Sequence, residues 1–219
     1  SGSGKTVFLK CMLGLFEPDE GYICYGSKTY KELTPKKRRE LRKQIGMVFQ
    51  GGALFDSMTV EENVMFPLKM LTKASRGEMK DRVNEVLRRV NLTNANEKLP
   101  SEISGGMQKR VSIARAIVNR PKFLFCDEPN SGLDPRTASV IDNLIQEITK
   151  EFDITTVINS HDMNSVFEIG EKIVYLEHGH IAWEGSKDLI YKTDNKAVTD
   201  FVYSSDLFRK VRVAQQKGY

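Results

Sequence analysis

The sequence predicts an α/β fold built around a parallel sheet. The segment from Phe123 to Cys126, FLFC, is an uninterrupted apolar run of strand length, which is typical of a strand buried on both faces. After this run, strand-like segments alternate with helical patterns, and the alternation favours a doubly wound sheet covered by helices. The sequence has no internal repeat and no low-complexity tract.

The first half of the chain mixes helical patterns with short strands and turns. Apolar residues recur at helical spacing after the opening residues and again from Thr59 onward. Turn-forming Pro and Gly residues separate these segments. The expected elements are a helix at Lys5–Phe16, a turn at Pro18–Gly21, a strand at Tyr22–Tyr25, a helix at Thr34–Lys43, a strand at Ile45–Phe49 and helical structure at Thr59–Val90, including a helix at Glu78–Val90.

The second half of the chain shows the alternation of strands and helices more clearly. Continuous apolar runs of strand length are separated by amphipathic stretches of helix length. The expected elements are a loop at Asn91–Ile103, a helix from Ser104, a strand at Phe123–Cys126, a helix at Pro135–Phe152, a strand at Thr155–Ile158, a helix from Met163, a strand at Ile173–Leu176 and a hairpin turn at His178-Gly179.

Composition limits the class of protein. With 219 residues and 40% hydrophobic residues, the chain suits one globular domain, or one domain with a small lobe. A net charge of +4 is too small to indicate a nucleic-acid partner. Cys11, Cys24 and Cys126 are an odd set without metal-ligand spacing, which predicts reduced core thiols and a cytosolic setting. No apolar run approaches the roughly 18 residues of a membrane span, so a role at a membrane needs a partner.

The chain opens with SGSGKT, the end of the phosphate-binding pattern G-x-x-x-x-G-K-[ST]. In such a loop, backbone N–H groups and the N-terminus of the next helix surround phosphate oxygens. Lys5 would reach the β- and γ-phosphates, and the Thr6 hydroxyl would bind Mg²⁺. The alternative is a flexible Gly-Ser segment, which G-K-T before an apolar helix disfavours. The candidate loop residues are Ser1, Gly2, Ser3, Gly4, Lys5 and Thr6.

Asp127 and Glu128 directly follow the apolar run FLFC. Ligands of parallel α/β sheets bind at the carboxyl ends of the strands, so these carboxylates are predicted to face the nucleotide. Asp127 could hold Mg²⁺ directly or through water, and Glu128 could polarise a water molecule. The alternative is a surface turn with two solvated carboxylates.

Ser104, Gly105 and Gly106 begin a long predicted helix. Serine is a good N-cap, and glycines let a phosphate approach the backbone closely. The alternative for this motif is an ordinary capped helix after a loop.

The histidines divide into two groups. His161 follows the strand that ends at Ile158, so it could contact the γ-phosphate at the same sheet edge as Asp127, although a lone histidine is commonly structural. His178 and His180 have the spacing of a metal pair but lack a third partner, and we expect them at the surface.

In chain order, these motifs resemble those of the ATPase subunit of ABC transporters, and the resemblance covers the whole chain. SGSGKT resembles the Walker A loop, FQ with Gln50 the Q-loop, and ISGGM the signature motif, with Ile and Met in place of the usual Leu and Gln. FLFCDEP resembles Walker B with its catalytic glutamate, SGLD with Asp134 the D-loop, and His161 the switch histidine. The resemblance implies a P-loop NTPase (RecA-like) core with a parallel sheet, a partial antiparallel β-subdomain and a helical signature subdomain.

The resemblance also implies cofactors, partners and roles. ATP and Mg²⁺ would bind between two copies of the chain arranged head to tail, and ATP hydrolysis would release the copies. The Gln50 loop and the segment Ala53–Leu68 would pass this motion to a membrane permease. The implied roles are catalysis for Glu128, His161 and Gln50, Mg²⁺ binding for Thr6, Gln50 and Asp127, and nucleotide binding for residues 1–6, Ser104, Gly105, Gly106 and Asp134.

A narrower resemblance is to the Mla-type ATPases, which serve phospholipid transporters that work with mammalian-cell-entry (MCE) proteins. It rests on FQGGALFDSMTVEENVMFPL, Phe49 to Leu68, and on SGGM. It implies an ATPase at the cytoplasmic face of the inner membrane that powers phospholipid transport. The alternative is the ATPase of another ABC importer or exporter.

Domain boundaries follow from the same resemblance. One ABC ATPase domain would span residues 1–219, with the helical subdomain at about 53–115 and a C-terminal extension at about 194–219. The family's β-lobe segment and the strand that leads into Walker A would precede Ser1, so we expect the chain to be truncated there. The extension would contact the partner ATPase from Phe201 to Val213, and the alternative is packing on its own domain.

Other classes fit less well. ABC proteins of DNA repair and chromosome organisation insert a long coiled coil between Walker A and the signature, and the segment Val7–Ile103 lacks sustained heptads. ABC proteins of translation carry two ATPase units per chain. A nucleotide-binding scaffold without turnover is disfavoured by Glu128 and His161. The basic run Pro35–Lys43 suggests anionic lipid or nucleic acid, but Glu40 interrupts it and favours a solvated helix face.

Overall fold

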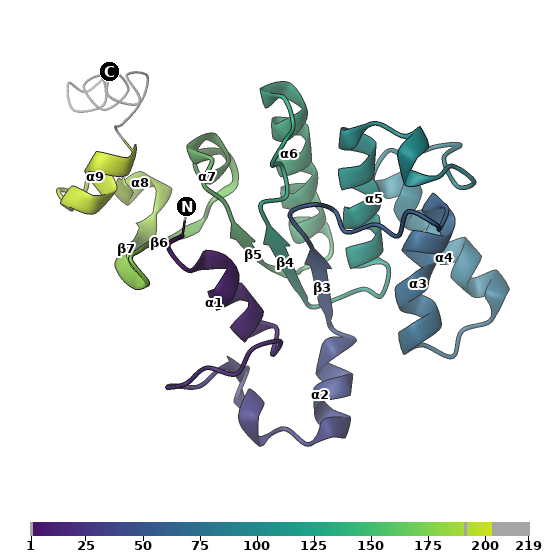
Figure 1. The fold of residues 1–219 in the computed structure, drawn as a ribbon, viewed down its shortest axis with the longest axis horizontal. Coiled ribbons are helices and arrows are strands. Elements are labelled where there is room, and N and C mark those ends of the chain that lie inside the picture. The colour runs from purple at the N-terminus through teal and green to yellow at the C-terminus, as the bar shows by residue number, and fades with distance from the viewer. Residues whose placement is uncertain (1, 191, 203–219) are drawn as a thin grey trace. The chain divides into compact units, whose positions relative to one another are not determined.

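The computed structural model of the chain describes residues 2–190 and 192–202. The chain forms two compact units, a larger one of Leu9–Asn159 and a smaller one that combines Ser1–Phe8 with Ser160–Tyr219. Helix α1, Lys5–Met12, begins in the smaller unit and ends in the larger one. Figure 1 labels most of the helices and strands of both units.

The larger unit contains the predicted parallel sheet. Its strands are β3 (Ile45–Val48), β4 (Phe123–Asp127) and β5 (Thr155–Asn159), with β4 in the centre and both pairings parallel. Successive β4 side chains point to opposite faces. Leu124 and Cys126 join the largest core cluster, whereas Phe125 packs with Leu9 and Leu13 near the end of α1. Apolar residues therefore cover β4 on both faces, as the run FLFC predicts.

The helices of the larger unit include the predicted helical region. Helices α3, α4 and α5 pack against one another, as Figure 1 shows, and supply most of the largest core cluster. The remaining elements of this unit are α2 (Pro35–Arg42), α3 (Val60–Leu71), α4 (Arg76–Arg89), α5 (Gly105–Ile117), α6 (Pro135–Glu151), the hairpin β1 (Cys24–Tyr25) and β2 (Lys28–Thr29), and the 3-10 turns η1 (Tyr30–Glu32) and η2 (Pro100–Glu102).

The segment Thr59–Val90 is helical as predicted and contains two helices, because Thr59 and Ser75 each begin a helix with a capping box that satisfies its first N–H groups. Two other sequence expectations need correction in this part of the chain. Helix α1 ends at Met12 rather than at Phe16, since Gly14 adopts a left-handed φ of 67° that a helix cannot accommodate. The strand expected at Tyr22–Tyr25 is only the two residues of β1.

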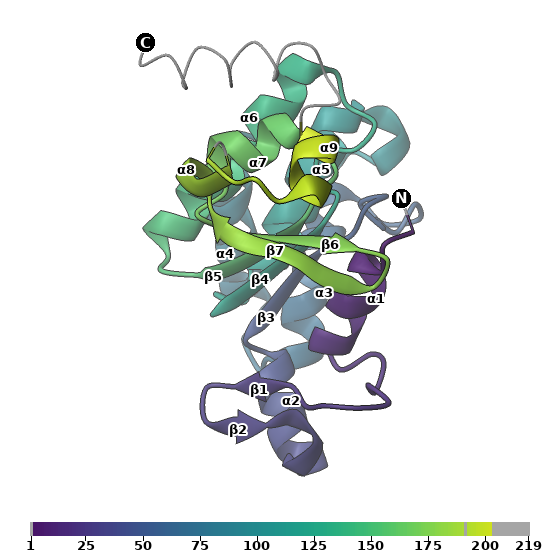
Figure 2. The same cartoon turned by 90° about the vertical axis from the view of Figure 1, so that its left-hand side faces the viewer.

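The smaller unit contains an antiparallel hairpin, visible in Figure 2, with helices packed on it. The turn lies at His178 and Gly179, both with positive φ, as predicted. Ile190, Val198 and Val202 form the buried core, on which Met163, Ile173 and Trp183 pack. The elements are α7 (Met163–Ile169), β6 (Lys172–Glu177), β7 (His180–Ser186), α8 (Lys187–Ile190) and α9 (Lys196–Val202).

The start of the apolar C-terminal segment packs on its own unit. Val198 and Val202 are almost fully buried, and the Phe201 ring lies 5.2 Å from the Tyr175 ring, centroid to centroid. These contacts correspond to the alternative of packing on its own domain. The rest of the predicted contact region, up to Val213, lies outside the described residues.

Surface features agree with most sequence expectations. His178 and His180 are exposed, as is most of the basic helix α2. Cys126 is buried, and burial raises the pKa of its thiol, but Cys24 is exposed and is therefore no core thiol. In residues 2–190 and 192–202, no helix has both the length and the hydropathy that a membrane span needs.

Candidate nucleotide-binding site

The opening loop has the backbone of a phosphate cradle. Gly2 and Gly4 have φ values of 84° and 89°, which residues with a side chain rarely adopt. A β-carbon at either position would meet no atom within 4 Å, so the backbone there is open to a ligand. Helix α1 begins at Lys5, which places its N-terminal N–H groups and partial positive charge beside the loop. Ser1 lies outside the described residues.

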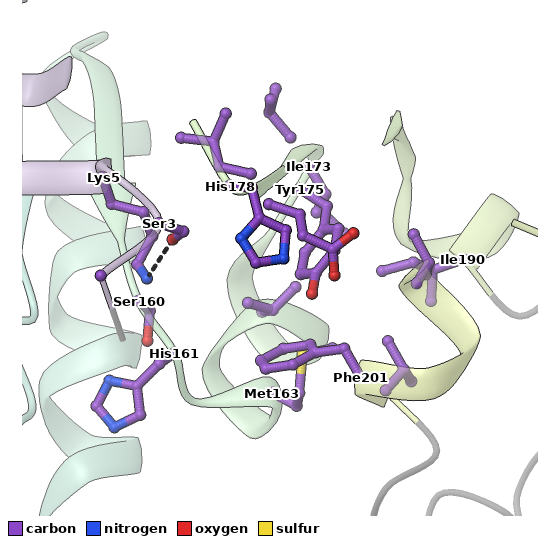
Figure 3. Close-up of a pocket in the computed structure, with 17 residues that line it drawn as sticks. Ser3, Lys5, Ser160, His161, Met163, Ile173, Tyr175, His178, Ile190 and Phe201 are labelled. Atoms are coloured by element: carbon purple, nitrogen blue, oxygen red, sulfur yellow. Dashed lines mark hydrogen bonds between the residues drawn. The ribbon is translucent and has the colours of Figure 1, made fainter. Parts of the chain in front are cut away.

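The loop borders a cavity of about 290 Å³, shown in Figure 3. Every residue that lines this cavity belongs to the smaller unit. Lys5 Nζ donates to Ser3 Oγ at 3.4 Å, and His161, which is exposed, lies at the same cavity. Tyr175 and Phe201 contribute aromatic surface to its wall. Lys5 and His161 thus lie at one cavity, and their contact with a common phosphate stays a prediction.

The two candidate carboxylates lie at the carboxyl end of β4. Asp127 is the last residue of β4, and it is opposite Asn159, the last residue of β5. Asn159 Nδ2 donates to Asp127 Oδ1 at 3.3 Å, and the Glu128 N–H donates to the Asn159 carbonyl at 2.9 Å. Glu128 has a left-handed φ of 49°, an uncommon conformation for a residue with a side chain. Asp127 and Glu128 are only 6% and 8% exposed, so a solvated surface turn is excluded.

Gln50 follows the neighbouring strand β3, so it leaves the sheet at the same edge as Asp127. The Gln50 side chain is exposed, and its backbone carbonyl accepts a hydrogen bond from Lys109 Nζ at 2.5 Å. Lys109 is buried on α5, and burial lowers its pKa while the negative charge of Glu128 partly offsets this effect. Lys109 therefore contacts the backbone of the segment that follows β3.

The remaining candidates begin helices. Ser104 caps α5 by accepting from the Met107 N–H at 3.3 Å, and Gly105 and Gly106 form the first turn. Asp134 caps α6 by accepting from the Thr137 N–H at 3.0 Å. Hydrogen bonding to the side chain and the backbone of Thr137 lowers the pKa of the Asp134 carboxyl group. Both caps are exposed, so these helix N-termini are accessible from outside the chain.

These residues are suited to ATP and Mg²⁺. The open glycine backbone and the Lys5 ammonium match the charge and size of a polyphosphate. Among the described residues, no group of three or more His, Cys, Asp or Glu side chains is arranged to hold a metal. Mg²⁺ at a nucleotide needs only one or two protein carboxylates, because phosphate oxygens and water supply its other ligands, and Asp127 meets that requirement.

Sequence reasoning missed Asn159 and Lys109. Asn159 could have been found, because it is a polar residue at the carboxyl end of the strand predicted beside FLFC, where ligands bind. Lys109 could not, because its burial depends on how α5 packs against the Gln50 loop.

The parallel sheet with a glycine-rich loop at a helix N-terminus defines a P-loop nucleotide-binding fold. A family model described as "ABC transporter" matches residues 1–131, which is more than half of the chain. This chain therefore belongs to the ABC transporter family and contains its ATP-binding domain.

Relatives and solved structures agree on this family. The chain is 38% identical over 202 residues to the probable ribonucleotide transport ATP-binding protein mkl of Mycobacterium leprae, covering 92% of this chain and 58% of that protein. It is 38% identical over 205 residues to the methionine import ATP-binding protein MetN 1 of Bacillus thuringiensis, covering 93% of this chain and 60% of that protein. The chain thus spans less than two thirds of the length of these relatives.

Two solved structures confirm the P-loop fold. The ATP-binding cassette MJ0796, a dimer in a post-hydrolysis state bound to ADP and Pi, matches with a TM-score of 0.76 and 33% identity, covering 85% of this chain and 82% of that one. The protein cbiO1 of Clostridium perfringens, part of the ABC transporter complex cbiONQ, matches with a TM-score of 0.80 and 28% identity, covering 96% of this chain and 84% of that one.

Proposed function

We propose that this chain is an ATP-hydrolysing subunit that powers an ABC transporter. The observation that carries the proposal is the buried pair Asp127 and Glu128 at the carboxyl end of a parallel strand, in a chain that also has the Gly2–Thr6 phosphate loop. In this fold, ligands bind at that edge of the sheet. ATP supplies the phosphoryl group that is transferred to water, and Mg²⁺ neutralises charge on its phosphates.

The residues of one chain have separate roles in binding and in catalysis. The loop N–H groups and Lys5 bind the phosphates, while Thr6, Gln50 and Asp127 bind Mg²⁺. Glu128 accepts a proton from the attacking water, which His161 and Gln50 help to orient. Asn159 supports this arrangement, because its side chain donates to the Asp127 carboxylate and its carbonyl accepts from the Glu128 N–H.

Partners complete the site and transmit its motion. A second copy presents the exposed Ser104 and Gly105 and the partly exposed Gly106, at the start of its α5, to the γ-phosphate, and Asp134 lies at this contact. Residues 53–115 form the helical subdomain that contacts a permease, and residues 194–219 form an extension. The chain is then peripheral, on the cytoplasmic face of the inner membrane.

The transported substrate that we propose is phospholipid, with an MCE protein as a further partner. The proposal rests on the segment Phe49–Leu68 and on SGGM. The relatives named above carry ribonucleotide and methionine transport in their names, and they favour the alternative of another ABC importer.

Lys5→Met tests the nucleotide site. Methionine keeps the length of the side chain but removes its charge, so the phosphates lose a charge-assisted contact worth about 1.5–3 kcal/mol. We expect Mg-ATP affinity to fall roughly ten- to a hundredfold in titration calorimetry. Lys10→Met on the same helix is the matched control, because Lys10 lies over the Phe16 ring instead. Equal affinity of wild type and Lys5→Met would contradict the proposed loop.

A transport assay tests the substrate. The complex is isolated from its source cell through a tag on this chain and placed in lipid nanodiscs, and its partners are identified by mass spectrometry. We expect an MCE protein and a permease, and an ATPase rate that changes severalfold with phospholipid composition. Stimulation by methionine or by ribonucleotides, with no response to phospholipid, would assign the complex to another importer class.

A further inference from the structure

Three buried side chains of α5 hold the loop that contains Gln50. Lys109, Ser112 and Arg115 follow one another at intervals of three residues, so they line one side of the helix. Their exposed fractions are 7%, 0% and 9%, and so low an exposure is rare for lysine and arginine without specific partners. Lys109 and Arg115 donate to backbone carbonyls of residues 50–53, which we name the Gln50 loop. The Ser112 hydroxyl lies within hydrogen-bond distance of the Gln108 carbonyl on its own helix and of the Gly52 carbonyl.

The hydrogen bonds are short and converge on adjacent carbonyls. Lys109 Nζ donates to the Gln50 carbonyl at 2.5 Å. Arg115 donates through two guanidinium nitrogens, to the Gly52 carbonyl at 2.6 Å and to the Ala53 carbonyl at 2.7 Å. Ser112 Oγ lies 3.1 Å from the Gly52 carbonyl. Charged donors in a buried setting make hydrogen bonds about twice as strong as neutral donors do.

The Gln50 loop needs such support. Gly52 and Ala53 have left-handed φ values of 76° and 48°, and this conformation is costly for alanine. A β-carbon on Gly52 would lie 2.9 Å from Ser112 Oγ, so the loop backbone sits directly against α5. The loop backbone is therefore held against α5, because side chains of Lys109 and Arg115 donate to its carbonyls and Gly52 lies close to Ser112.

The same helix begins at Ser104, Gly105 and Gly106, the residues proposed to face the γ-phosphate bound by a second copy. Helix α5 therefore carries both these residues and the side chains that hold the Gln50 loop. We propose that Lys109, together with Arg115, is a positioning residue that makes α5 and the Gln50 loop move as one body. The expected effect on turnover rests on the proposed function. The attachment of the Gln50 loop to α5 by hydrogen bonds is independent of that function.

The first experiment measures, without nucleotide, how strongly α5 protects the Gln50 loop from local opening. Hydrogen exchange of residues 49–54 is compared between wild type, Lys109→Met and Lys109→Arg. Loss of one charge-assisted hydrogen bond increases local opening, so we expect exchange about ten- to a hundredfold faster in Lys109→Met. Lys109→Arg keeps the charge and the donor, and we expect it to recover most of the protection. Exchange in Lys109→Met within twofold of wild type would overturn the attachment of the loop to α5.

Arg110→Met is the matched control, because Arg110 neighbours Lys109 on α5 but donates to the Asn91 carbonyl. It removes the same charge without touching the Gln50 loop, and we expect wild-type exchange at residues 49–54. Exchange of α6 peptides reports whether Lys109→Met has loosened the whole unit. If α6 exchanges equally faster, Arg115→Lys, which keeps the charge but cannot make both guanidinium hydrogen bonds to the loop, must still raise exchange selectively at residues 49–54 for the proposal to stand.

The second experiment measures the consequence for turnover. Because a misplaced loop affects the reaction rather than ATP affinity, we expect kcat of Lys109→Met to fall about tenfold or more while KM stays within threefold. Lys109→Arg should recover kcat, and Arg110→Met should not change it. Faster exchange with unchanged kcat would overturn the positioning role. If the wild-type chain hydrolyses no ATP in its complex, the proposed function fails, whereas the exchange experiment still decides the attachment of the loop to α5.

Discussion

Glu128→Gln is expected to leave ATP binding intact and to reduce turnover by about 100- to 10,000-fold. The reason is chemical, since glutamine matches glutamate in shape but cannot accept a proton from water, and general-base catalysis contributes a factor of this size. The Glu128 backbone is held by the Asn159 carbonyl, and this hydrogen bond does not involve the side chain that is changed. The variant should therefore fold like the wild type.

The measurements for this prediction are steady-state ATP hydrolysis, Mg-ATP titration and the mass of the nucleotide-bound species. With hydrolysis blocked, we expect the ATP-bound dimer to accumulate. Glu17→Gln is the matched control, because Glu17 is a largely exposed carboxylate of the same unit, paired with Lys31. A variant that retains most of the wild-type kcat would assign the base to another group and leave Glu128 a structural role.

The carboxylate site was largely predictable from sequence because it follows from strand order. The apolar run before Asp127 identifies a buried parallel strand, and the strand end identifies the ligand side. The phosphate loop was predictable because G-K-T has few other uses before a helix.

Some helix boundaries differ from the prediction although capping residues mark them in the sequence. The patterns Thr59-x-x-Glu62 and Ser75-x-x-Glu78 are capping boxes, and they divide the region into α3 and α4. Gly14 similarly ends α1 early. The position of Lys109 differs in kind, because a buried lysine is explained only by carbonyls from a segment far away in sequence. Such tertiary polar contacts leave no periodic signal for sequence reasoning to detect.

Asn63 is a buried polar residue whose partners are near in sequence, and its replacement should have the largest effect on stability. Asn63 lies fully buried on α3. Its Oδ1 accepts from the Phe55 N–H at 2.8 Å, and its Nδ2 lies 3.1 Å and 3.0 Å from the carbonyls of Phe55 and Met58. One side chain therefore holds the segment that leads from the Gln50 loop into α3, including the Phe55 ring that packs on Phe66.

Asn63→Ala should lower the free energy of unfolding by about 2–4 kcal/mol, because several backbone groups lose their partner and each unsatisfied buried group costs about 1–3 kcal/mol. The exposure of Phe55 lets water compensate in part, which keeps the expected cost below the full sum. Asn63→Asp should be no better than alanine, because its second carboxyl oxygen would face the carbonyls that Nδ2 now contacts.

Urea unfolding with an unchanged m-value measures the free energy of unfolding of both variants. Asn143→Ala, at an exposed position of α6, is the control and should change stability by less than about 0.5 kcal/mol. If Asn63→Ala costs as little as this control, the amide does not hold the segment, and the Phe55–Phe66 packing alone must fix it.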